Sequence, residues 1–296
     1  MLMCSSGTAI AVLLCLPTAL ASAAGSGAAG KPFFCKPLVL GAHRGGRLLW
    51  PENTLEAFKN AAARWPDALL EGDAQLTADG HVVLLHDKAV DRTTNGTGPV
   101  AEMTLAEVKA LDAGYRFTRD HGQTFPYRGK GIVVPTLAEV LRALPDSRFL
   151  IELKLQTGVA EPTVKVLEEA DALDRVAVAS ISVPLMNLAR RLAPNLICCY
   201  DLNNGIEMLN RLRQPDWASY EPTADILAIN EDILHGFKLE PDDLEALRRK
   251  GITVLMHTIN SADRMRHLLD AGVASVLSDR PDLLSEVLAE RGASGR

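Results

Sequence analysis

The sequence predicts a (β/α)₈ barrel, in which eight parallel strands alternate with helices. Eight apolar runs of strand length recur along the 296-residue chain, and amphipathic stretches lie between most of them. Because the runs are almost continuously apolar, they fit a parallel sheet that is covered on both faces. A doubly wound open sheet is the alternative, but no GxGxxG follows the first strand, which disfavours a dinucleotide-binding version. The strand candidates are residues 38–42, 69–76, 149–155, 176–180, 196–200, 226–230, 253–259 and 274–278.

Six amphipathic stretches are the helix candidates that would cover this sheet. Thr54 and Ser261 are favourable N-cap residues, and Gly251 and Gly272 are favourable C-terminal stops. The helix candidates are residues 54–64, 136–144, 161–172, 184–192, 241–250 and 262–271.

The alternation is interrupted after the second strand. Residues 77–80 (Thr-Ala-Asp-Gly) predict a turn, and residues 81–86 return as the second arm of a hairpin. A small insertion over residues 101–135 follows, with one short helix expected at 105–111 and a segment rich in Gly, Arg and aromatic residues. Connections of this length in a compact domain are usually functional. We therefore expect the insertion to serve as a lid or to bind substrate.

The N-terminus predicts a cleaved segment. Residues 8–24 carry no charge and are rich in Ala and Leu, and Ala21-Ser22-Ala23 follows. This indicates a secretory signal peptide over residues 1–23, although no Lys or Arg precedes the apolar run. A membrane anchor is the alternative, but the run is shorter than the roughly 20 residues that a span needs. We expect a flexible leader at 24–37, a folded domain at 38–290, a secreted or periplasmic location, and no stable membrane span after cleavage.

Composition and cysteine content exclude some classes of protein. The net charge is −6 with no block of like charge, so we expect no nucleic-acid partner. Cys35, Cys198 and Cys199 remain after signal cleavage, and no Cys/His spacing indicates a zinc site. Cys198 and Cys199 are neighbours in an apolar run, so they should point to opposite faces of a strand as small buried residues.

Three acids in the predicted strands suggest a metal site. Glu71 and Asp73 are two residues apart, so both face the same side of a strand. Their mutual repulsion would be relieved by a cation, and carboxylates suit Mg²⁺ or Ca²⁺. Glu152 lies inside the third strand and would join them at the barrel mouth, with Lys154 on the same face ready to meet an anion. The alternatives are a pair of solvated acids and an internal Glu152–Lys154 salt bridge.

Two histidines flank these acids. His43 ends the first strand and His86 ends the hairpin. Imidazole titrates near neutral pH, so one ring can accept a proton while the other donates one. Arg44 offers a planar guanidinium suited to a phosphate. The alternatives are structural histidines and a surface ion pair of Arg44.

These residues belong to a set of short motifs that extends along the chain. The motifs are His43-Arg44-Gly45, Pro51-Glu52-Asn53-Thr54, Glu71-x-Asp73, Thr77-x-Asp79-Gly80, His86-Asp87, Arg92-Thr93-Thr94-Asn95-Gly96-Thr97-Gly98, Leu111-Asp112-Ala113-Gly114, Val134-Pro135-Thr136-Leu137, Ile151-Glu152-Leu153-Lys154 and Ser278-Asp279-Arg280-Pro281-Asp282. Any single motif is weak, but in combination the set specifically resembles the glycerophosphodiester phosphodiesterase family over about residues 38–288.

The resemblance implies metal-dependent hydrolysis of small-molecule glycerophosphodiesters to glycerol 3-phosphate and an alcohol. It implies a site at the C-terminal ends of the barrel strands, with the insertion at 101–135 shaping the pocket. The residues implied are Glu71, Asp73 and Glu152 for one divalent cation, Ca²⁺ or Mg²⁺; His43 and His86 for acid/base catalysis; and Arg44 and Lys154 for the phosphate.

The chain departs from the family pattern at two places. His257 occupies the position where a site-lining Trp is common, so it is a possible pocket residue. Ser180 is followed by Ile181, where the family often has Phe. Both departures leave the preferred alcohol open, and the oligomeric state is also open.

Two other functions are compatible with these motifs. A lysophospholipase D-type or sphingomyelinase-D-like enzyme would need an apolar groove, and residues 115–127 offer aromatic residues without a long apolar patch. A non-catalytic phosphate-binding barrel would have no need for both histidines.

Overall fold

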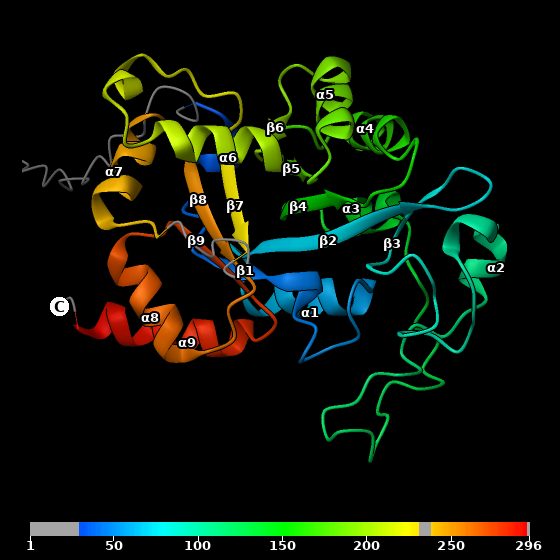
Figure 1. Ribbon diagram of the computed structural model, residues 1–296. Helices are drawn as coiled ribbons and strands as arrows, with labels where there is room; N and C mark the ends of the chain where they lie inside the picture. The colour runs from blue at the N-terminus through cyan, green and yellow to red at the C-terminus, as the bar shows by residue number, and fades with distance from the viewer. Residues whose placement is uncertain (1–29, 231–237, 295–296) are drawn as a thin grey trace, which may run out of the picture.

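The computed structural model describes residues 30–230 and 238–294, and within them eight parallel strands form a nearly closed barrel (Figure 1). The order around the barrel is β6-β5-β4-β2-β1-β9-β8-β7, and a parallel bridge between Cys199 and Ile226 joins the two end strands. The predicted fold class and all eight strand candidates are confirmed. The strands are β1 (Leu40–Ala42), β2 (Leu69–Leu76), β4 (Arg148–Leu153), β5 (Val176–Ala179), β6 (Ile197–Cys198), β7 (Ile226–Asn230), β8 (Thr253–His257) and β9 (Ser275–Ser278).

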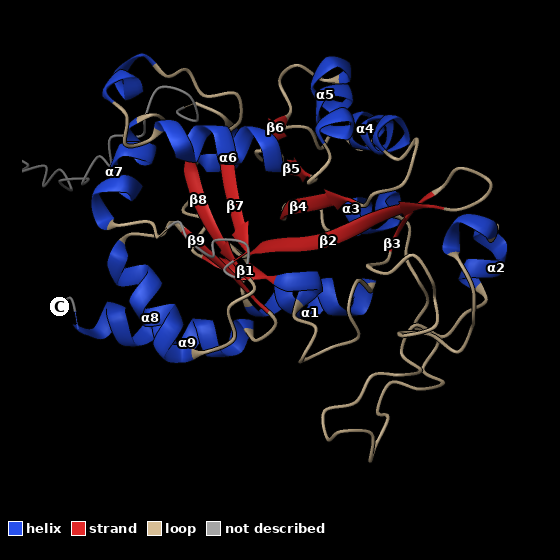
Figure 2. Ribbon diagram, in the orientation of Figure 1, coloured by secondary structure: helices blue, strands red, loops and turns tan. Residues whose placement is uncertain are grey.

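Helices surround the strands on the outside (Figure 2). The six predicted helices are present, and α6 and α9 are additional. The α6 segment contains three Asn and a Gly, which are poor helix formers, so its sequence gives a weak helical pattern. The helices of the barrel are α1 (Leu55–Arg64), α3 (Leu137–Ala143), α4 (Ala160–Glu169), α5 (Val183–Leu192), α6 (Leu202–Arg211), α7 (Pro241–Arg249), α8 (Ala262–Ala271) and α9 (Pro281–Ser294).

The predicted hairpin and insertion form a unit beside β2. The strand β3 (Val82–Leu84) pairs antiparallel with β2, and α2 (Leu105–Lys109) follows. Both lie on the side of the molecule away from α7 and α8 (Figure 1). This unit has a small apolar core of its own, which includes Val83, Val90, Val100 and Val108. Short 3₁₀ helices occur at Pro32–Phe34, His43–Gly45, Val100–Glu102 and Pro215–Ser219.

Strand alternation divides the barrel interior into an apolar floor and a polar top. Leu69 on β2 and Leu150 on β4 point into the barrel, where they pack with Leu255 and Leu277. Residues two further along a strand share its face. The same alternation therefore places the side chains of residues 71 and 152 above this floor, toward the C-terminal end of the barrel.

Arg148 closes the opposite end of the barrel. Its guanidinium is buried and donates hydrogen bonds to the carbonyl oxygens of Phe33 (3.0 Å), Lys36 (2.6 Å), Pro37 (3.0 Å) and Asp67 (2.7 Å). Phe33 is 1% exposed and packs against the interior floor. The expectation of a flexible leader up to residue 37 is therefore wrong for residues 32–37, which belong to the fold because Arg148 and Phe33 hold them there.

The remaining N-terminal expectations concern the signal peptide and the rest of the leader, and residues 1–29 lie outside the described residues. No helix in the part of the chain that the structure describes is long and apolar enough to cross a membrane. Cys198 and Cys199 are both buried, Cys198 toward the helices and Cys199 in the barrel interior, as predicted.

Replacement of Arg148 by Met should lower the free energy of unfolding by about 3 kcal/mol, because several buried carbonyls lose their donor. Chemical denaturation of the folded variant measures this loss. Arg249→Met is the matched control, since its side chain is 75% exposed and its solvent-exposed pair with Glu245 should contribute little to stability. A loss at Arg148 no larger than at Arg249 would contradict this role.

Candidate active site

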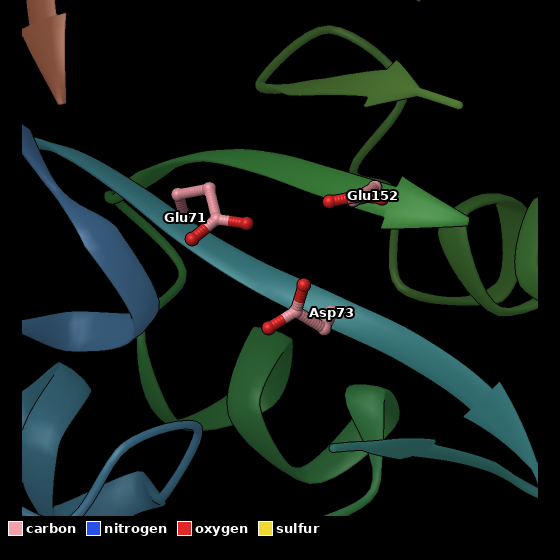
Figure 3. Close-up of side chains that lie close together, drawn as sticks. All are labelled: Glu71, Asp73 and Glu152. Atoms are coloured by element: carbon pink, nitrogen blue, oxygen red, sulfur yellow. The ribbon is translucent and has the colours of Figure 1, made fainter. Parts of the chain in front are cut away.

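Three carboxylates meet across β2 and β4: Glu71 and Asp73 come from the middle of β2, and Glu152 comes from near the C-terminal end of β4 (Figure 3). Asp73 and Glu152 are partners in the parallel β2–β4 register, and Glu71 lies two residues before Asp73 on the same face. One oxygen from each lies within 4.8 Å of the others. Glu71 is 4% exposed and Asp73 is 1% exposed, while Glu152 is half-buried. The structure thus brings together the three acids that the sequence singled out.

The loop between β1 and α1 holds Asp73 in place. Asn53, in a left-handed backbone conformation (φ 57°), donates from Nδ2 to Asp73 Oδ2 (2.7 Å) and accepts from the Asp73 backbone N–H (3.1 Å). A Cβ at Gly72 would lie 3.1 Å from Asn53 Oδ1 and 3.1 Å from a Phe58 ring carbon. Gly72 therefore lets the loop approach the strand closely enough for both hydrogen bonds.

Burial and neighbouring charges shift the pKa values of Glu71 and Asp73 in opposite directions. Burial, together with the negative charge of Asp73, raises the pKa of Glu71 to about 7. Burial would also raise the pKa of Asp73, but Lys154 and Arg44 outweigh it and hold that pKa below its usual range. The Arg44 backbone N–H donates to Glu71 Oε2 (2.8 Å). Glu71 is thus more easily protonated than Asp73.

The donor set fits a hard divalent cation. Three carboxylates of like charge converge, and two of them are almost fully buried, an arrangement that a cation stabilises. Oxygen ligands of this kind suit Mg²⁺ and Ca²⁺. The cluster can therefore hold one such ion, and these residues do not discriminate between the two metals.

Each of the two predicted histidines is paired with an aspartate through Nδ1. The Nδ1–H of His43 donates to Asp279 Oδ1 (2.6 Å), and that of His86 donates to Asp87 Oδ1 (2.7 Å). These bonds leave Nε2 of each ring as the atom that can exchange a proton. His43 Nε2 lies 3.8 Å from Glu71 Oε2, so this nitrogen faces the carboxylate cluster.

The surroundings of His43 favour its charged form. Burial lowers the pKa of the ring, but Glu71 and Asp279 together outweigh burial and raise it above its usual value. Asp279 itself remains ionised: burial opposes this, but hydrogen bonds from His43 and Asn260 and the ion pair with Arg47 hold its pKa far below the usual range. The charged carboxylate of Asp279 therefore fixes the orientation of the His43 ring through Nδ1.

Both predicted phosphate ligands lie at the cluster and are paired with its acids. Lys154 Nζ is 2.8 Å from Asp73 Oδ1 and 3.0 Å from Glu152 Oε2, so the salt bridge considered as an alternative is present. Arg44 Nε lies 3.4 Å from Asp73 Oδ2, and its Nη1 donates to Glu52 Oε1 (3.0 Å). Their contact with a phosphate stays a prediction.

A chain of ion pairs links Arg44, the neighbour of His43, to His86. Arg92 donates to both carboxylate oxygens of Glu52 (2.7 and 2.8 Å) and to Asp87 Oδ2 (2.5 Å). Glu52 also accepts from Arg44, while Asp87 accepts from His86. Burial would raise the pKa of Asp87, but Arg92 and His86 lower it to about 2. Asp87 therefore stays anionic behind its histidine.

Sequence reasoning assigned no role to the partners of the histidines and of Arg44. Asp279 is 236 residues from His43, and Arg92 is 40 residues from Glu52. In the sequence these partners are marked only by their place in the motifs quoted above, since the pairings arise when the chain folds.

A cavity of about 110 Å³ adjoins the cluster, lined on one side by His43, Glu71 and Glu152. His257 also lines it. Burial lowers the pKa of His257 to about 4, and His43 and Lys154 add to the effect, so its ring is neutral near pH 7. The remaining walls are mostly apolar.

The chain matches the model of the glycerophosphoryl diester phosphodiesterase family over residues 43–283. It is 32% identical to a glycerophosphodiester phosphodiesterase of Caldanaerobacter subterraneus, over 87% of this chain and all of the relative. It is 31% identical to one of Bacillus subtilis, over 83% of this chain and 85% of the relative.

Solved structures show the same fold. The glycerophosphoryl diester phosphodiesterase domain of a Mycobacterium tuberculosis protein superposes with a TM-score of 0.74 at 23% identity, covering 86% of this chain and all of that one. A phosphodiesterase of Oleispira antarctica, in complex with its product sn-glycerol-3-phosphate, superposes with a TM-score of 0.70 at 26% identity, covering 86% of this chain and 97% of that one.

Glu152→Gln should weaken binding of Ca²⁺ or Mg²⁺ by about 10- to 100-fold or more. Loss of a group that only hydrogen-bonds to a metal ligand already weakens metal binding by about that factor, and Glu152 would be a ligand itself. Isothermal titration calorimetry measures the affinity, and Glu56→Gln, on the exposed face of α1, is the matched control. Equal affinities for Glu152→Gln and the control would contradict a metal site at the cluster.

Because Glu71 must lose its proton to bind a cation, the affinity of the unaltered protein for Ca²⁺ or Mg²⁺ should rise between about pH 6 and about pH 8.

Asp279→Asn should lower the pKa of His43, because the variant removes a carboxylate that favours the imidazolium while burial and Arg44 still oppose it. An NMR titration of the imidazole resonances measures the shift. Asp282→Asn is the control, since that carboxylate pairs with Arg280. An unchanged or higher pKa of His43 in Asp279→Asn would show that the pair does not set its protonation.

Proposed function

Because this chain belongs to the glycerophosphoryl diester phosphodiesterase family of enzymes, we propose that it hydrolyses glycerophosphodiesters to glycerol 3-phosphate and an alcohol with one divalent cation, Ca²⁺ or Mg²⁺. The observation that carries the proposal is the position of His43. Asp279 holds its ring through Nδ1, and its Nε2 lies 3.8 Å from Oε2 of Glu71, one of the three clustered carboxylates. The product bound to the Oleispira antarctica phosphodiesterase supports the proposed product.

Glu71, Asp73 and Glu152 would hold the cation. A bound divalent cation supplies Lewis-acid stabilisation of phosphodiester charge, typically several kcal/mol. The raised pKa of Glu71 fits this role, since a proton and a cation compete for the same buried carboxylate.

Arg44 and Lys154 would bind the non-bridging phosphate oxygens. Both are largely buried and keep their charge, because the acids around them raise their pKa values against the effect of burial. In the structure both pair with Asp73, so they lie beside the place where a phosphate would meet the cluster. Donors fixed in advance stabilise the charge that grows on the phosphate oxygens in the transition state.

His43 and His86 would move the protons. One Nε2 takes a proton from the attacking oxygen, which belongs to water or to the neighbouring hydroxyl of the glycerol. If the hydroxyl attacks, a cyclic phosphate forms as the alcohol leaves, and water opens it to glycerol 3-phosphate in a second step. The other Nε2 gives a proton to the oxygen of the leaving alcohol. Asp279 and Asp87 hold the rings through Nδ1. Asp279 also favours the charged form of His43.

His43→Ala and His86→Ala should each lower kcat on glycerophosphocholine by about 10²- to 10⁴-fold, the usual contribution of a general acid or base. Release of glycerol 3-phosphate measures turnover. The matched control is His81→Ala at the hairpin turn, where the side chain is 53% exposed. Near-normal turnover by either site variant would refute its assignment.

Removal of divalent cations with EDTA should abolish turnover, and added Ca²⁺ or Mg²⁺ should restore it, because without a cation the three carboxylates repel the substrate phosphate. The same release assay, with each metal added back separately, measures the recovery. Full activity in EDTA would exclude metal dependence.

A further inference from the structure

The two histidines of the site are held in different ways. His43 directly follows β1, and its ring is bound by Asp279, which directly follows β9, so two barrel strands fix its place. His86 lies two residues beyond the end of β3, and its ring is bound by Asp87, the next residue in the chain. The pair of His86 and Asp87 therefore orients the ring within its own segment, and other contacts are needed to hold that segment to the barrel.

Gln75 provides such a contact. Its side chain is 2% exposed, and its Nε2 donates to the carbonyl oxygens of Leu85 (3.0 Å) and His86 (3.2 Å) and also to that of Asp87. An amide nitrogen carries two hydrogens, so at least one of them is shared between carbonyls. The β2–β3 ladder ends at Leu84, and the side chain of Gln75 thus binds the three residues that follow the ladder.

Gln75 belongs to the strand face that carries the acids. It lies on β2, two residues after Asp73 and four after Glu71, so these three side chains point to the same side of the strand. The backbone N–H of Leu85 also donates to the carbonyl oxygen of Asp73 (2.8 Å). The segment that carries His86 is therefore bound to β2 at residues 73 and 75, beside two of the residues proposed to hold the cation.

An ion pair between Arg92 and Asp87 also holds this segment, but it is more open to solvent. The side chain of Arg92 is 43% exposed and that of Asp87 is 33% exposed. Water weakens ion pairs at such positions, whereas hydrogen bonds of a buried amide are shielded from it. The amide of Gln75 is thus better placed to keep the segment at a fixed distance from β2.

We propose that Gln75 is a positioning residue that sets the place of His86 relative to the carboxylate cluster. This inference rests on the proposed function, in which His86 exchanges a proton with the substrate. Gln75 acts through the main chain of residues 85–87 and not on the substrate itself. Catalysis is sensitive to such a contact, because a misplacement of about 1 Å can cost about 10²-fold in rate.

Gln75→Met tests this role, because methionine is also unbranched but has no N–H donor. With Ca²⁺ present, the variant should lower kcat on glycerophosphocholine by about 10²-fold, measured by release of glycerol 3-phosphate. KM should change little, since Arg44 and Lys154 still bind the phosphate. The affinity for Ca²⁺, measured by isothermal titration calorimetry, should equal that of the unaltered protein, because the three carboxylates are intact.

A double-variant cycle separates the positioning of His86 from a general effect on the fold. In the His86→Ala background, Gln75→Met should cause no further loss of kcat, since the ring whose place it disturbs is already removed. A loss of similar size with and without the His86 side chain would show that Gln75 acts on another part of the site, and it would overturn the proposal.

Gln156→Met is the matched control. The side chain of Gln156 also binds the main chain of β2: its Oε1 accepts from the N–H of Leu76 (2.7 Å), and its Nε2 donates to the carbonyl of Leu76 (3.0 Å). Neither bond goes to residues 85–87. This variant should therefore lose some stability but keep the kcat of the unaltered protein. Equal losses of kcat in Gln75→Met and Gln156→Met would overturn the proposal.

Gln75→Asn is a second variant for the case in which Gln75→Met does not fold. It keeps an amide that is one methylene too short for the three carbonyls, so kcat should fall in the same way. Normal kcat in either folded variant would overturn the proposal and leave the proposed function standing. Failure of both variants to fold would also overturn it, because the barrel itself would then need the amide. No turnover by the unaltered protein would remove the proposed function and this inference together.

Discussion

The burial of three carboxylates against one another is the constraint on which the rest of the site depends. Like charges in a low-dielectric interior repel strongly, and each buried charge also loses its hydration. The chain offsets this by placing Lys154 and Arg44 against Asp73, and by satisfying Asp73 with Asn53. The negative charge of Glu71 is stabilised less, so burial and the repulsion from Asp73 leave Glu71 with a raised pKa. A cluster of this kind is well suited to exchange a proton for a divalent cation.

The barrel makes such a cluster possible because its two ends have different chemistry. The interior floor is apolar, so the acids above it are shielded from below, and Arg148 binds main-chain carbonyls at the far end. The strand periodicity that turns Leu69 and Leu150 inward also turns Glu71 and Glu152 inward, two residues later. Stability and chemistry therefore use the same face of each strand at different heights, as is usual for this fold.

The sequence was informative where the physical signal is local. Strand runs, N-caps and the spacing of Glu71 and Asp73 depend on residues close together in the chain, and they predicted the barrel and the acid cluster. The helix α6 was missed because its intrinsic propensity is low, and it is stabilised by buried Met208 and Leu209. The leader was misjudged because Phe33 and Arg148, which fix it, are 115 residues apart. The same applies to the pairing of His43 with Asp279, which only the folded chain brings together.

We propose that Glu71, Asp73 and Glu152 bind one cation beside His43. A crystal structure of the protein grown with Ca²⁺ and glycerol 3-phosphate is the direct test of this site. We expect one calcium ion at about 2.3–2.6 Å from an oxygen of each carboxylate, with phosphate oxygens on Arg44 and Lys154. Calcium bound elsewhere, or three carboxylates that stay unligated at saturating Ca²⁺ with Lys154 still paired to Asp73, would contradict it.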